Sequence, residues 1–425
     1  MLPLGLHFLA ALGTALASLL SLLLLLAVSR QLWTLGWNVR RDRGNKLPLP
    51  KGSMGWPLLG ETLHWMVQIL ARVFSHAALD SYLPGIQRLI RSRVRAWCRE
   101  PAPVAVYPAA KALTFCIAVR VLLGLQAAEQ QLDRLAATFE QLMENIFSLP
   151  VDMPFSGLRK GLKARDALHQ YLETAIAEKL QAERLLSQPD ALSLMLRSAR
   201  ENGSELNLQE LKEAAVELIF AAFSTTASAS TSLVLLLLQH SEALEKVRQE
   251  LGQHGLLREG PGCECQPLLR LDTLSRLRYL DCVVKEVLRL LPPVSGGYRT
   301  ALQTFELNGC QIPKGWNIIY SIRDTQETAA VYLNPDTFDP DRFGPERDES
   351  KAGRFNYLPF GGGVRSCVGR KLAQVILKTL AVELSSAATW ELASATFPKM
   401  QTVPVVHPVD GLKVRFHRLG GMVTK

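Results

Sequence analysis

The stretch FGGGVRSCVG, residues 360–369, places a single cysteine in a glycine-rich loop. Arg365 stands two residues before Cys367, and the periodic apolar segment 370–386 predicts a helix directly after the loop. Glycines allow a backbone to lie flat against a large planar ligand and to aim its N–H groups at a sulfur. What Cys367 binds therefore decides what the chain does.

Four chemistries use a cysteine in such a position, and three of them fit this sequence poorly. A zinc site needs about four ligands, but the pair Cys263 and Cys265 lies about a hundred residues away. A phosphate-binding loop needs Gly-Lys-Ser/Thr where this chain has Gly-Val-Arg-Ser. A cysteine nucleophile needs a histidine base, and no histidine stands out by its spacing.

A haem thiolate, the fourth chemistry, fits each neighbour of the cysteine. The N-terminus of the following helix would stabilise a negative sulfur. Arg365 can reach a haem propionate as a charge-assisted partner. Taken alone, however, the loop is equally compatible with a buried, inert cysteine, so other parts of the chain must decide.

The composition is that of a folded globular protein, because 48% of the 425 residues are hydrophobic and 20% are charged. The net charge of +9 suits an anionic partner or a membrane surface. Nucleic acid would need a denser basic cluster with interleaved aromatic residues, so we predict no nucleic-acid partner. The cysteines are odd in number and irregularly spaced, which favours a reducing compartment. They are Cys98, Cys116, Cys263, Cys265, Cys282, Cys310 and Cys367.

Residues 1–29 are predicted to be a membrane anchor. The segment 4–28 has no formal charge and is long enough to cross a bilayer core of ~30 Å. Basic residues follow this segment and none precedes it, so the rest of the chain is predicted to face the cytosol. Residues 30–61 form a basic, proline-rich hinge, and residues 62–425 form the main domain. The alternative is a cleaved signal peptide with its cut near Val28, although the apolar stretch is long for one.

Most of the main domain has helical periodicity, with breaks at proline or glycine. Strand signals appear in FELNGCQIP, with a turn at Asn308-Gly309, then in WNIIYSI, and in VPVVHPVDGLKVRF, with a turn at Asp410-Gly411. The predicted fold class is therefore mainly α with a smaller β region. The predicted helices are 75–100, 111–125, 132–147, 162–186, 206–240, 276–291 and 370–386.

Four arginines fall at helical spacing on one face of the first predicted helix. The ordinary interpretation of such a stripe is a solvated helix face. The alternative is a docking patch for an acidic redox partner. The residues are Arg88, Arg91, Arg95 and Arg99.

Two further motifs precede the cysteine loop. Glu286 and Arg289 stand three apart in KEVLR, and Arg342 lies in the loop PDRF, residues 340–343. Alone, a Glu–Arg pair at this spacing is usually an exposed ion pair worth ~0.2–0.5 kcal/mol. In this order, before Phe-x-x-Gly-x-Arg-x-Cys-x-Gly, the motifs resemble those of the cytochrome P450 family.

The resemblance implies a cytochrome P450 fold, in which haem b lies between a long central helix and the cysteine loop. It implies that Cys367 is the ligand of the haem iron. It also implies a buried ionic lock of Glu286, Arg289 and Arg342 that holds the cysteine pocket. The further haem-binding residues that it implies are Arg299, Arg365, Phe360, Gly361 and Gly369.

In the central helix the resemblance concerns AAFSTT, residues 221–226. Thr225 aligns with the family threonine that hydrogen-bonds bound oxygen and helps to deliver protons. Ser224 stands where many relatives carry an acid, so proton delivery would depend more on water and hydroxyls. The alternative for Thr225 is a hydroxyl bonded back to its own helix carbonyl. The predicted substrate-pocket residues, each equally compatible with ordinary core, are Phe223, Pro293, Val294 and Ser295.

Longer runs, among them FSLPVDMPFSGLRKG and YLPFGGGVRSCVG, resemble the vertebrate retinoic acid hydroxylases. This resemblance implies hydroxylation of all-trans and 9-cis retinoic acid at the 4- or 18-position. The oxidant is O₂, with electrons from NADPH through NADPH–cytochrome P450 reductase. The resemblance also implies residence in the endoplasmic reticulum membrane, in contact with lipid.

The resemblance is interrupted after Gln68, where relatives carry a block of residues that this chain lacks. That block normally contributes the first sheet strands, a loop over the substrate and a helix that grips a propionate. Its loss predicts unpaired sheet edges and an opened haem cavity. One alternative is therefore a splice or truncated form that binds haem or retinoid weakly without turnover. Another, suggested by Ser224 and opposed by Thr225, is a haem-thiolate isomerase that needs no reductase.

Overall fold

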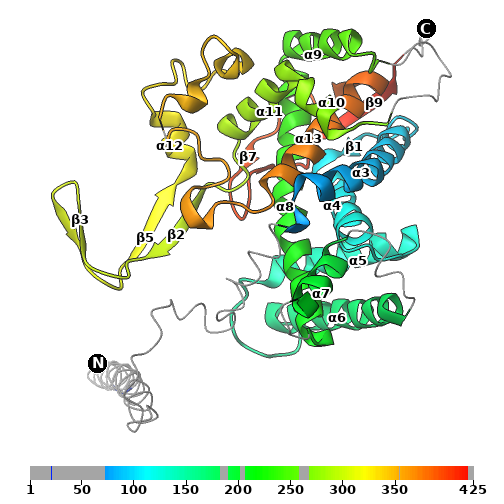
Figure 1. The fold of residues 1–425 in the computed structure, drawn as a ribbon, viewed down its shortest axis with the longest axis vertical. Coiled ribbons are helices and arrows are strands. Elements are labelled where there is room, and N and C mark those ends of the chain that lie inside the picture. Colours follow the sequence, from blue (N-terminus) through cyan, green and yellow to red (C-terminus); the bar gives the residue numbers. More distant parts are fainter. Residues whose placement is uncertain are drawn as a thin grey trace, which may run out of the picture. The chain divides into compact units, whose positions relative to one another are not determined.

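The computed structural model describes most of the chain from residue 72 onward (Figure 1). The chain divides into two compact units, residues 1–61 and 62–425, and apart from Ser21 every described residue belongs to the second. The rest of the predicted anchor, the hinge, Gln68 and the pair Cys263 and Cys265 lie outside the described residues. The described residues are 21, 72–181, 190–201, 206–257, 268–353 and 355–419.

Helices dominate the second unit, as the apolar periodicity predicts. Every predicted helix has a counterpart whose ends differ by at most five residues, except that the counterpart of 111–125 ends eight residues before the predicted end. The counterparts are α3 (His76–Trp97), α4 (Val106–Ile117), α5 (Glu129–Asn145), α6 (Gly157–Gln181), α8 (Leu208–Gln239), α11 (Arg278–Leu290) and α13 (Arg370–Ala387). The sequence did not predict α7 (Ala191–Glu201), α9 (Ser241–Gln253), α10 (Leu271–Arg276) or α12 (Ile322–Thr328).

The core is built around α8, which runs through the middle of the helical body (Figure 1). The helix starts at a capping box, in which Asn207 and Glu210 each accept a hydrogen bond from the other's main-chain N–H. Residues 226–237 are all buried, so this part of the helix has no solvent face. α4, α11 and α13 pack against it, and α13 also packs against α3.

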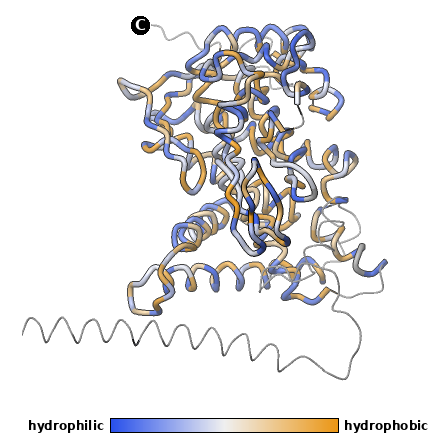
Figure 2. Tube along the Cα trace, turned by 90° about the vertical axis from the view of Figure 1, so that its left-hand side faces the viewer, coloured by the Kyte–Doolittle hydropathy of each residue, from blue (hydrophilic) through white to orange (hydrophobic). Residues whose placement is uncertain are grey.

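Among the described residues, α8 is also the one helix that is long and apolar enough to cross a membrane. Within its most apolar window, 72% of the residues are buried inside the protein. The outer helices, in contrast, alternate between hydrophilic and hydrophobic residues along their length (Figure 2). The apolar character of α8 is therefore that of a core helix.

The strands of the described residues form four small antiparallel sheets. The largest joins β1 (Val104–Ala105), β9 (Lys413–Arg418) and β6 (Ala388–Leu392), in that order. The others are pairs: β2 (Gly296–Thr300) with β5 (Asn317–Ser321), β3 (Phe305–Leu307) with β4 (Cys310–Ile312), and β7 (Met400–Gln401) with β8 (His407–Pro408). The mainly helical fold with a smaller β region is thus confirmed.

Both predicted turns are present. Asn308 and Gly309 have φ of 50° and 74°, the left-handed pair that a tight hairpin requires, and they join β3 to β4. At the second turn Gly411 has φ of 78°. There, however, the flanking strands do not pair with each other, because β8 pairs with β7 whereas β9 pairs with β6 and β1.

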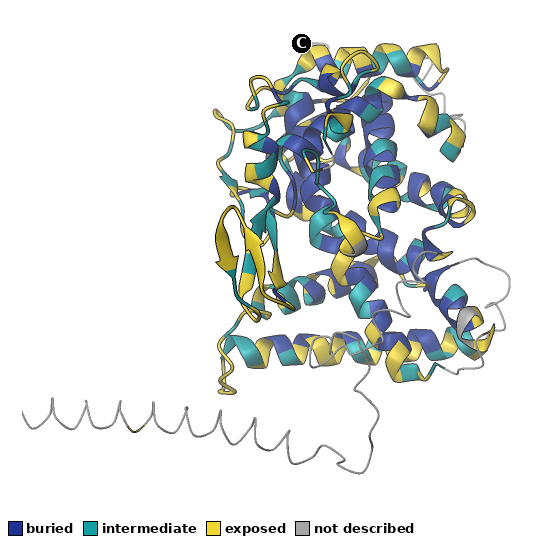
Figure 3. Cartoon of the chain, turned by 60° about the vertical axis from the view of Figure 1, so that its left-hand side comes forward, coloured by how far each residue is buried: buried dark blue, intermediate teal, exposed yellow. Residues whose placement is uncertain are grey.

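The strands β2 to β5 project from the helical body, and we call them the strand arm (Figures 1 and 3). Its outer face is apolar and open to solvent: Tyr298 and Ile319 are cross-strand partners and are 73% and 67% exposed. Leu302 and Trp316, at the ends of these strands, are also exposed. Within the described residues, neither β2 nor β5 has a partner on its other edge.

Candidate active site

Main-chain hydrogen bonds close the cysteine loop, residues 358–369. The N–H of Cys367 donates to the carbonyl of Phe360 (2.9 Å), and that of Gly361 donates to the carbonyl of Leu358 (2.9 Å). Gly361 and Gly363 have φ of 67° and 70°, a conformation that a side chain disfavours. These two glycines are therefore needed for the path of the loop, which leads directly into α13.

The sulfur of Cys367 is held beside hydrogen-bond donors. Although the residue is exposed, partial desolvation of its sulfur raises the pKa of the thiol. The main-chain N–H groups of Gly369 and Arg370 donate toward the sulfur and act in the opposite direction, as does the charge of Arg370. These donors lie at the N-terminus of α13, where helix N–H groups have no intrahelical partner. An accessible thiol with donors of this kind is suited to a thiolate ligand.

The predicted ionic lock is assembled, and it is buried. Glu286, Arg289 and Arg342 are each at most 1% exposed. Arg289 Nε lies 2.7 Å from Glu286 Oε2, and Arg342 Nε lies 3.4 Å from Glu286 Oε1. The interpretation of the Glu–Arg pair as an exposed ion pair is therefore wrong. Burial raises the pKa of Glu286, and the hydrogen bonds and charge of Arg289 oppose that rise.

The ionic lock has further members that the sequence did not predict. Glu349 lies 3.4 Å from Arg342 Nη1, and the main-chain N–H of Asp339 donates to Glu286 Oε1 (2.9 Å). Each arginine also donates to a loop carbonyl: Arg289 to Pro335 (2.7 Å) and Arg342 to Asn334 (2.8 Å). The ionic lock thus fixes the segment 334–349, which leads toward the cysteine loop, against α11.

In α8 the hydroxyl of Thr225 donates to the carbonyl of Ala221 (2.7 Å). This is the helix-bonded alternative, and it leaves the hydroxyl oxygen as an acceptor for other groups. Ser224 is partly buried beside it. The geometry leaves both residues available for proton handling without assigning that role to them.

The side chain of Phe223 belongs to the core. It is 1% exposed and forms edge-on ring contacts with Phe139 (centroids 5.1 Å apart) and Phe115 (6.2 Å). Phe223 packs in the core of this structure, and its contact with substrate stays a prediction. The physical reason is that α5 and α4 cover this side of α8 with aromatic rings.

The other predicted pocket residues join α11 to β2. Pro293 is buried and its carbonyl accepts from the N–H of Val406 (3.0 Å), whereas Val294 is 39% exposed. Ser295 accepts through its carbonyl from Ile322 (2.8 Å), while its own hydroxyl is buried without a hydrogen-bond partner in the described residues. Val294 is thus the most exposed member of this group, whereas the Ser295 hydroxyl is buried.

The two arginines predicted to meet haem propionates are both exposed. Arg299, in β2, donates to the hydroxyl of Tyr320 (3.1 Å) and stacks over its ring. That hydroxyl lies 3.9 Å from the place where a side chain on Gly361 would begin. Tyr320 therefore brings Arg299 to the cysteine loop that contains Arg365, a link between distant residues that the sequence did not indicate.

The arginine stripe of α3 is only partly solvated. Arg91 lies 3.0 Å from Glu383, which is fully buried in α13, so Arg91 has a structural partner. Arg88 and Arg99 are exposed. Together with Arg95 and Ser92 they line a hollow of about 410 Å³, and the prediction of a docking patch there stays a prediction.

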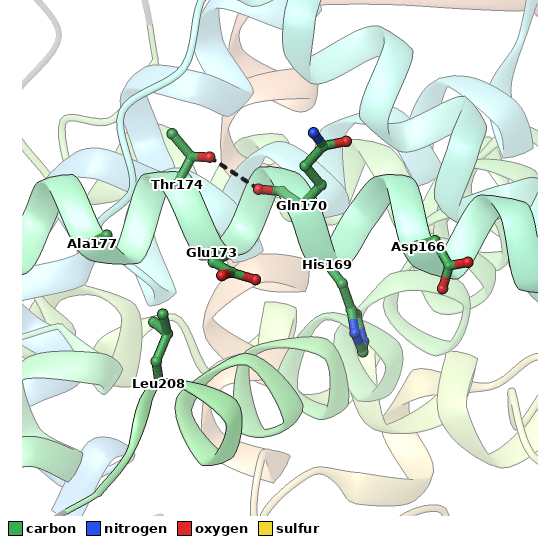
Figure 4. A pocket seen from close by; sticks show the side chains of 7 residues that line it. All are labelled: Asp166, His169, Gln170, Glu173, Thr174, Ala177 and Leu208. Carbon is green, nitrogen blue, oxygen red and sulfur yellow. Dashed lines mark hydrogen bonds between the residues drawn. The ribbon is translucent and has the colours of Figure 1, made fainter.

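A larger hollow of about 560 Å³ lies against α6 (Figure 4). Polar side chains line it, and in the close-up His169 and Glu173 project from the same helix. None of its residues is a predicted site residue. Its remaining lining residues are Asp166, Gln170, Thr174, Ala177 and Leu208.

The residues around Cys367 fit a haem thiolate. The thiol is exposed, its donors converge on the sulfur, and the loop beside it turns on two glycines that present no side chain. Arg299 in β2 and Arg365 in the cysteine loop are exposed cations in this region. No group of three or more histidine, cysteine or acidic side chains that could hold a metal ion occurs among the described residues.

Comparison with known proteins identifies the family of the chain. The family model for cytochrome P450 matches residues 114–416. Human cytochrome P450 26C1 is 52% identical over 511 aligned positions, covering 99% of this chain and 98% of that protein. Mouse cytochrome P450 26B1 is 49% identical over 490 positions, covering 98% and 96%. Among solved structures, a retinoic acid-bound cyanobacterial CYP120A1 has a TM-score of 0.75 and 34% identity, covering 85% of this chain and 79% of that one.

The chain is shorter than these relatives, and the difference is internal. The alignment with cytochrome P450 26C1 spans 511 positions, 86 more than the 425 residues of the chain, yet it covers almost all of both proteins. The position of the missing block after Gln68 stays a prediction. With a family model over most of the chain and relatives that are half identical, the chain belongs to the cytochrome P450 family and is a cytochrome P450 monooxygenase.

Proposed function

We propose that this protein hydroxylates all-trans and 9-cis retinoic acid at the 4- or 18-position, with O₂ and electrons from NADPH delivered by a flavoprotein reductase. The observation that carries the proposal is the 34% identity to a solved structure with retinoic acid bound, over 85% of this chain. The near-complete alignment with cytochromes P450 26C1 and 26B1 supports the same substrate class. Retinoic acid is an apolar polyene with one carboxylate, which suits a dry pocket.

We further propose that residues 1–29 anchor the protein in the endoplasmic reticulum membrane and that residues 30–61 form a hinge to the domain 62–425. The anchor segment is apolar and basic residues follow it, which favours a cytosolic domain. An anchored enzyme meets its apolar substrate in the lipid and its reductase on the same surface.

Bound haem b would supply the activation of O₂ for insertion into a C–H bond. Cys367 would ligate the iron, with the N–H groups of Gly369 and Arg370 stabilising its negative sulfur. Arg299 and Arg365 would pair with the propionates. The ionic lock of Glu286, Arg289 and Arg342 keeps the segment before the cysteine loop in place.

Proton handling would fall to Thr225 and Ser224. The Thr225 hydroxyl donates its proton to a hydrogen bond with the carbonyl of Ala221. The hydroxyl oxygen can therefore accept a hydrogen bond from a donor such as water. Ser224 contributes a second hydroxyl rather than a carboxylate. Val294 and Ser295 would border the substrate.

Retinoic acid turnover in microsomes tests the proposal. The full chain, co-expressed with NADPH–cytochrome P450 reductase, is expected to consume all-trans retinoic acid and to form a hydroxylated product only when NADPH is present. Cys367→Ala should abolish product, while the exposed Cys310→Ala on the strand arm, a matched control, should not change it.

The alternatives predict different results in the same assay. A shortened form that binds haem or retinoid without turnover would give a retinoid-induced spectral change but no product with NADPH. The observation that motivates it is that the alignment with cytochrome P450 26C1 is 86 positions longer than this chain. An isomerase would convert its substrate without NADPH or reductase, and that outcome would contradict the monooxygenase proposal.

A further inference from the structure

We propose that Gln326 is a positioning residue that couples the ionic lock to the cysteine loop. The proposal rests on the proposed role of Cys367 as haem ligand. Gln326 lies in α12, a short helix outside every motif that identifies the family in this sequence. Its side chain is fully buried, at 0% exposure.

The amide of Gln326 bridges two segments that are distant in the sequence. Its Nε2 donates to the carbonyl of Arg289 (2.8 Å) and lies 3.4 Å from the carbonyl of Leu288. Its Oε1 accepts from the main-chain N–H of Leu358 (3.1 Å). One side chain thus contacts the end of α11, which carries the ionic lock, and the start of the cysteine loop.

Both partners of Gln326 need such a bridge. Arg289 and Leu288 lie in the last turn of α11, where helix carbonyls have no intrahelical donor. Leu358 begins the turn that ends at Gly361, whose N–H donates to the Leu358 carbonyl. Replacing the amide by an apolar group would leave a carbonyl and an N–H without partners in the protein interior.

Two contacts fix the N-terminal end of α12, the helix that carries Gln326. α12 begins at Ser321, whose hydroxyl accepts from the N–H of Asp324 (3.0 Å). The carbonyl of Ser295 accepts from the N–H of Ile322 (2.8 Å), which ties the same end of α12 to the segment after α11. A buried donor and acceptor on a helix held in this way can set the distance between α11 and the cysteine loop.

A second and parallel connection runs through Tyr357. Its hydroxyl donates to the carbonyl of Lys285 in α11 (3.1 Å). Tyr357 directly precedes Leu358, the first residue of the cysteine loop, so two adjacent residues are bound to α11, Tyr357 directly and Leu358 through Gln326. Loss of Gln326 should therefore loosen the loop without releasing it, and the N–H groups near the Cys367 sulfur would lose their alignment.

The test compares Gln326→Met with Thr328→Ala in the full chain. Methionine keeps the length of the side chain but makes neither hydrogen bond of the amide. Thr328→Ala removes a hydrogen bond of a hydroxyl within the same helix, at an exposed residue. Amide hydrogen exchange over residues 355–367 is measured on both proteins and on the unaltered chain. In parallel, the share of bound haem that shows the thiolate signature is measured in the reduced carbon monoxide complex.

In Gln326→Met the Leu358 amide hydrogen is expected to exchange about tenfold faster, and a smaller fraction of the bound haem should show the thiolate signature. Thr328→Ala should change neither quantity. If Gln326→Met matches Thr328→Ala in both readouts, the positioning role is wrong. If Gln326→Met fails to fold, Gln326→Asn decides instead. Its shorter amide cannot span both partners, so it should show the same two effects, and unchanged readouts would overturn the proposal.

The two readouts separate this proposal from the assignment of the haem ligand. Amide exchange needs no bound haem, so faster exchange in Gln326→Met supports the coupling even in a chain without turnover. A thiolate signature that survives in Cys367→Ala would instead contradict the ligand assignment alone.

Discussion

The segment around the cysteine loop and the strand arm lie close in the sequence. The first buries paired charged groups, whereas the second exposes apolar side chains to solvent. Around the cysteine loop, charged groups are buried and paired, as Glu286 with Arg289 shows. On the strand arm, apolar side chains such as Tyr298 and Ile319 face solvent, and the described strand edges are free. The dark blue centre and the yellow hairpin of Figure 3 display the same contrast.

This difference shows which part of the fold is complete in this chain. A buried ion pair needs hydrogen bonds from its surroundings, and here the carbonyls of Pro335 and Asn334 and the N–H of Asp339 supply them from within the described residues, while Arg289 Nη1 and Arg342 Nε have none there. An apolar sheet face with free edges is the kind of surface that proteins normally cover. The uncovered strand arm and the 86 additional aligned positions of cytochrome P450 26C1 are therefore consistent with a loss that affects the arm more than the cysteine loop.

The largest expected effect comes from breaking the ionic lock. Glu286→Ala leaves Arg289 and Arg342 buried without their shared carboxylate and should lower the free energy of unfolding by about 3–5 kcal/mol. Glu306→Ala on the strand arm, the matched control, should change it by less than about 0.5 kcal/mol because Glu306 is exposed. Urea unfolding followed by circular dichroism measures both. Equal effects would show that the two regions do not differ as described.

Thiol labelling should separate the regions by about two orders of magnitude. Burial raises the pKa of Cys282 in α11 to about 11 from an ordinary value of 9.0, so at neutral pH its reactive thiolate is about 100-fold scarcer than that of an unperturbed thiol. Cys310 in β4 is exposed. Iodoacetamide followed by mass spectrometry should modify Cys310 first, and Cys282 only as the pH approaches its pKa or the protein unfolds. Rapid labelling of Cys282 at neutral pH would refute the burial of α11.

A matched pair of threonine substitutions sharpens the comparison further. Val283→Thr places a hydroxyl in the core of α11, where the residue is 0% exposed, and should cost about 1–3 kcal/mol of unfolding free energy. Ile319→Thr on the outer face of the strand arm should cost less than about 0.5 kcal/mol, since that side chain is largely exposed. Thermal unfolding of the two variants checks the prediction. A large cost for Ile319→Thr would mean that another segment covers this face.

The helices and the site motifs could be predicted because they depend on local patterns. The apolar periodicity of 206–240 and of 276–291 predicts α8 and α11, and an Asn-Gly pair predicts the hairpin of β3 and β4. The seven-residue helix α12 is too short to show such a period. Sequence also left two roles open for Thr225, since the same hydroxyl can bond to its helix or to a ligand.

Contacts between distant residues that belong to no family motif could not be predicted from the sequence. Gln326 meets Leu358 and Tyr320 meets Arg299 because the fold brings separate segments together. For Phe223 the sequence left a pocket wall and ordinary core open, and the structure shows its packing with Phe139. Helix spacing gives the face of a residue only relative to its own helix, and the neighbouring elements determine what covers that face.

The reduced carbon monoxide spectrum of the full chain in microsomes tests most directly whether Cys367 is the haem ligand. The unaltered chain and Cys310→Ala should both show the thiolate signature, and Cys367→Ala should retain the fold by circular dichroism but lose that signature. A signature that persists in Cys367→Ala, or that is missing from the unaltered chain although haem is bound, would contradict the assignment of this sulfur to the iron.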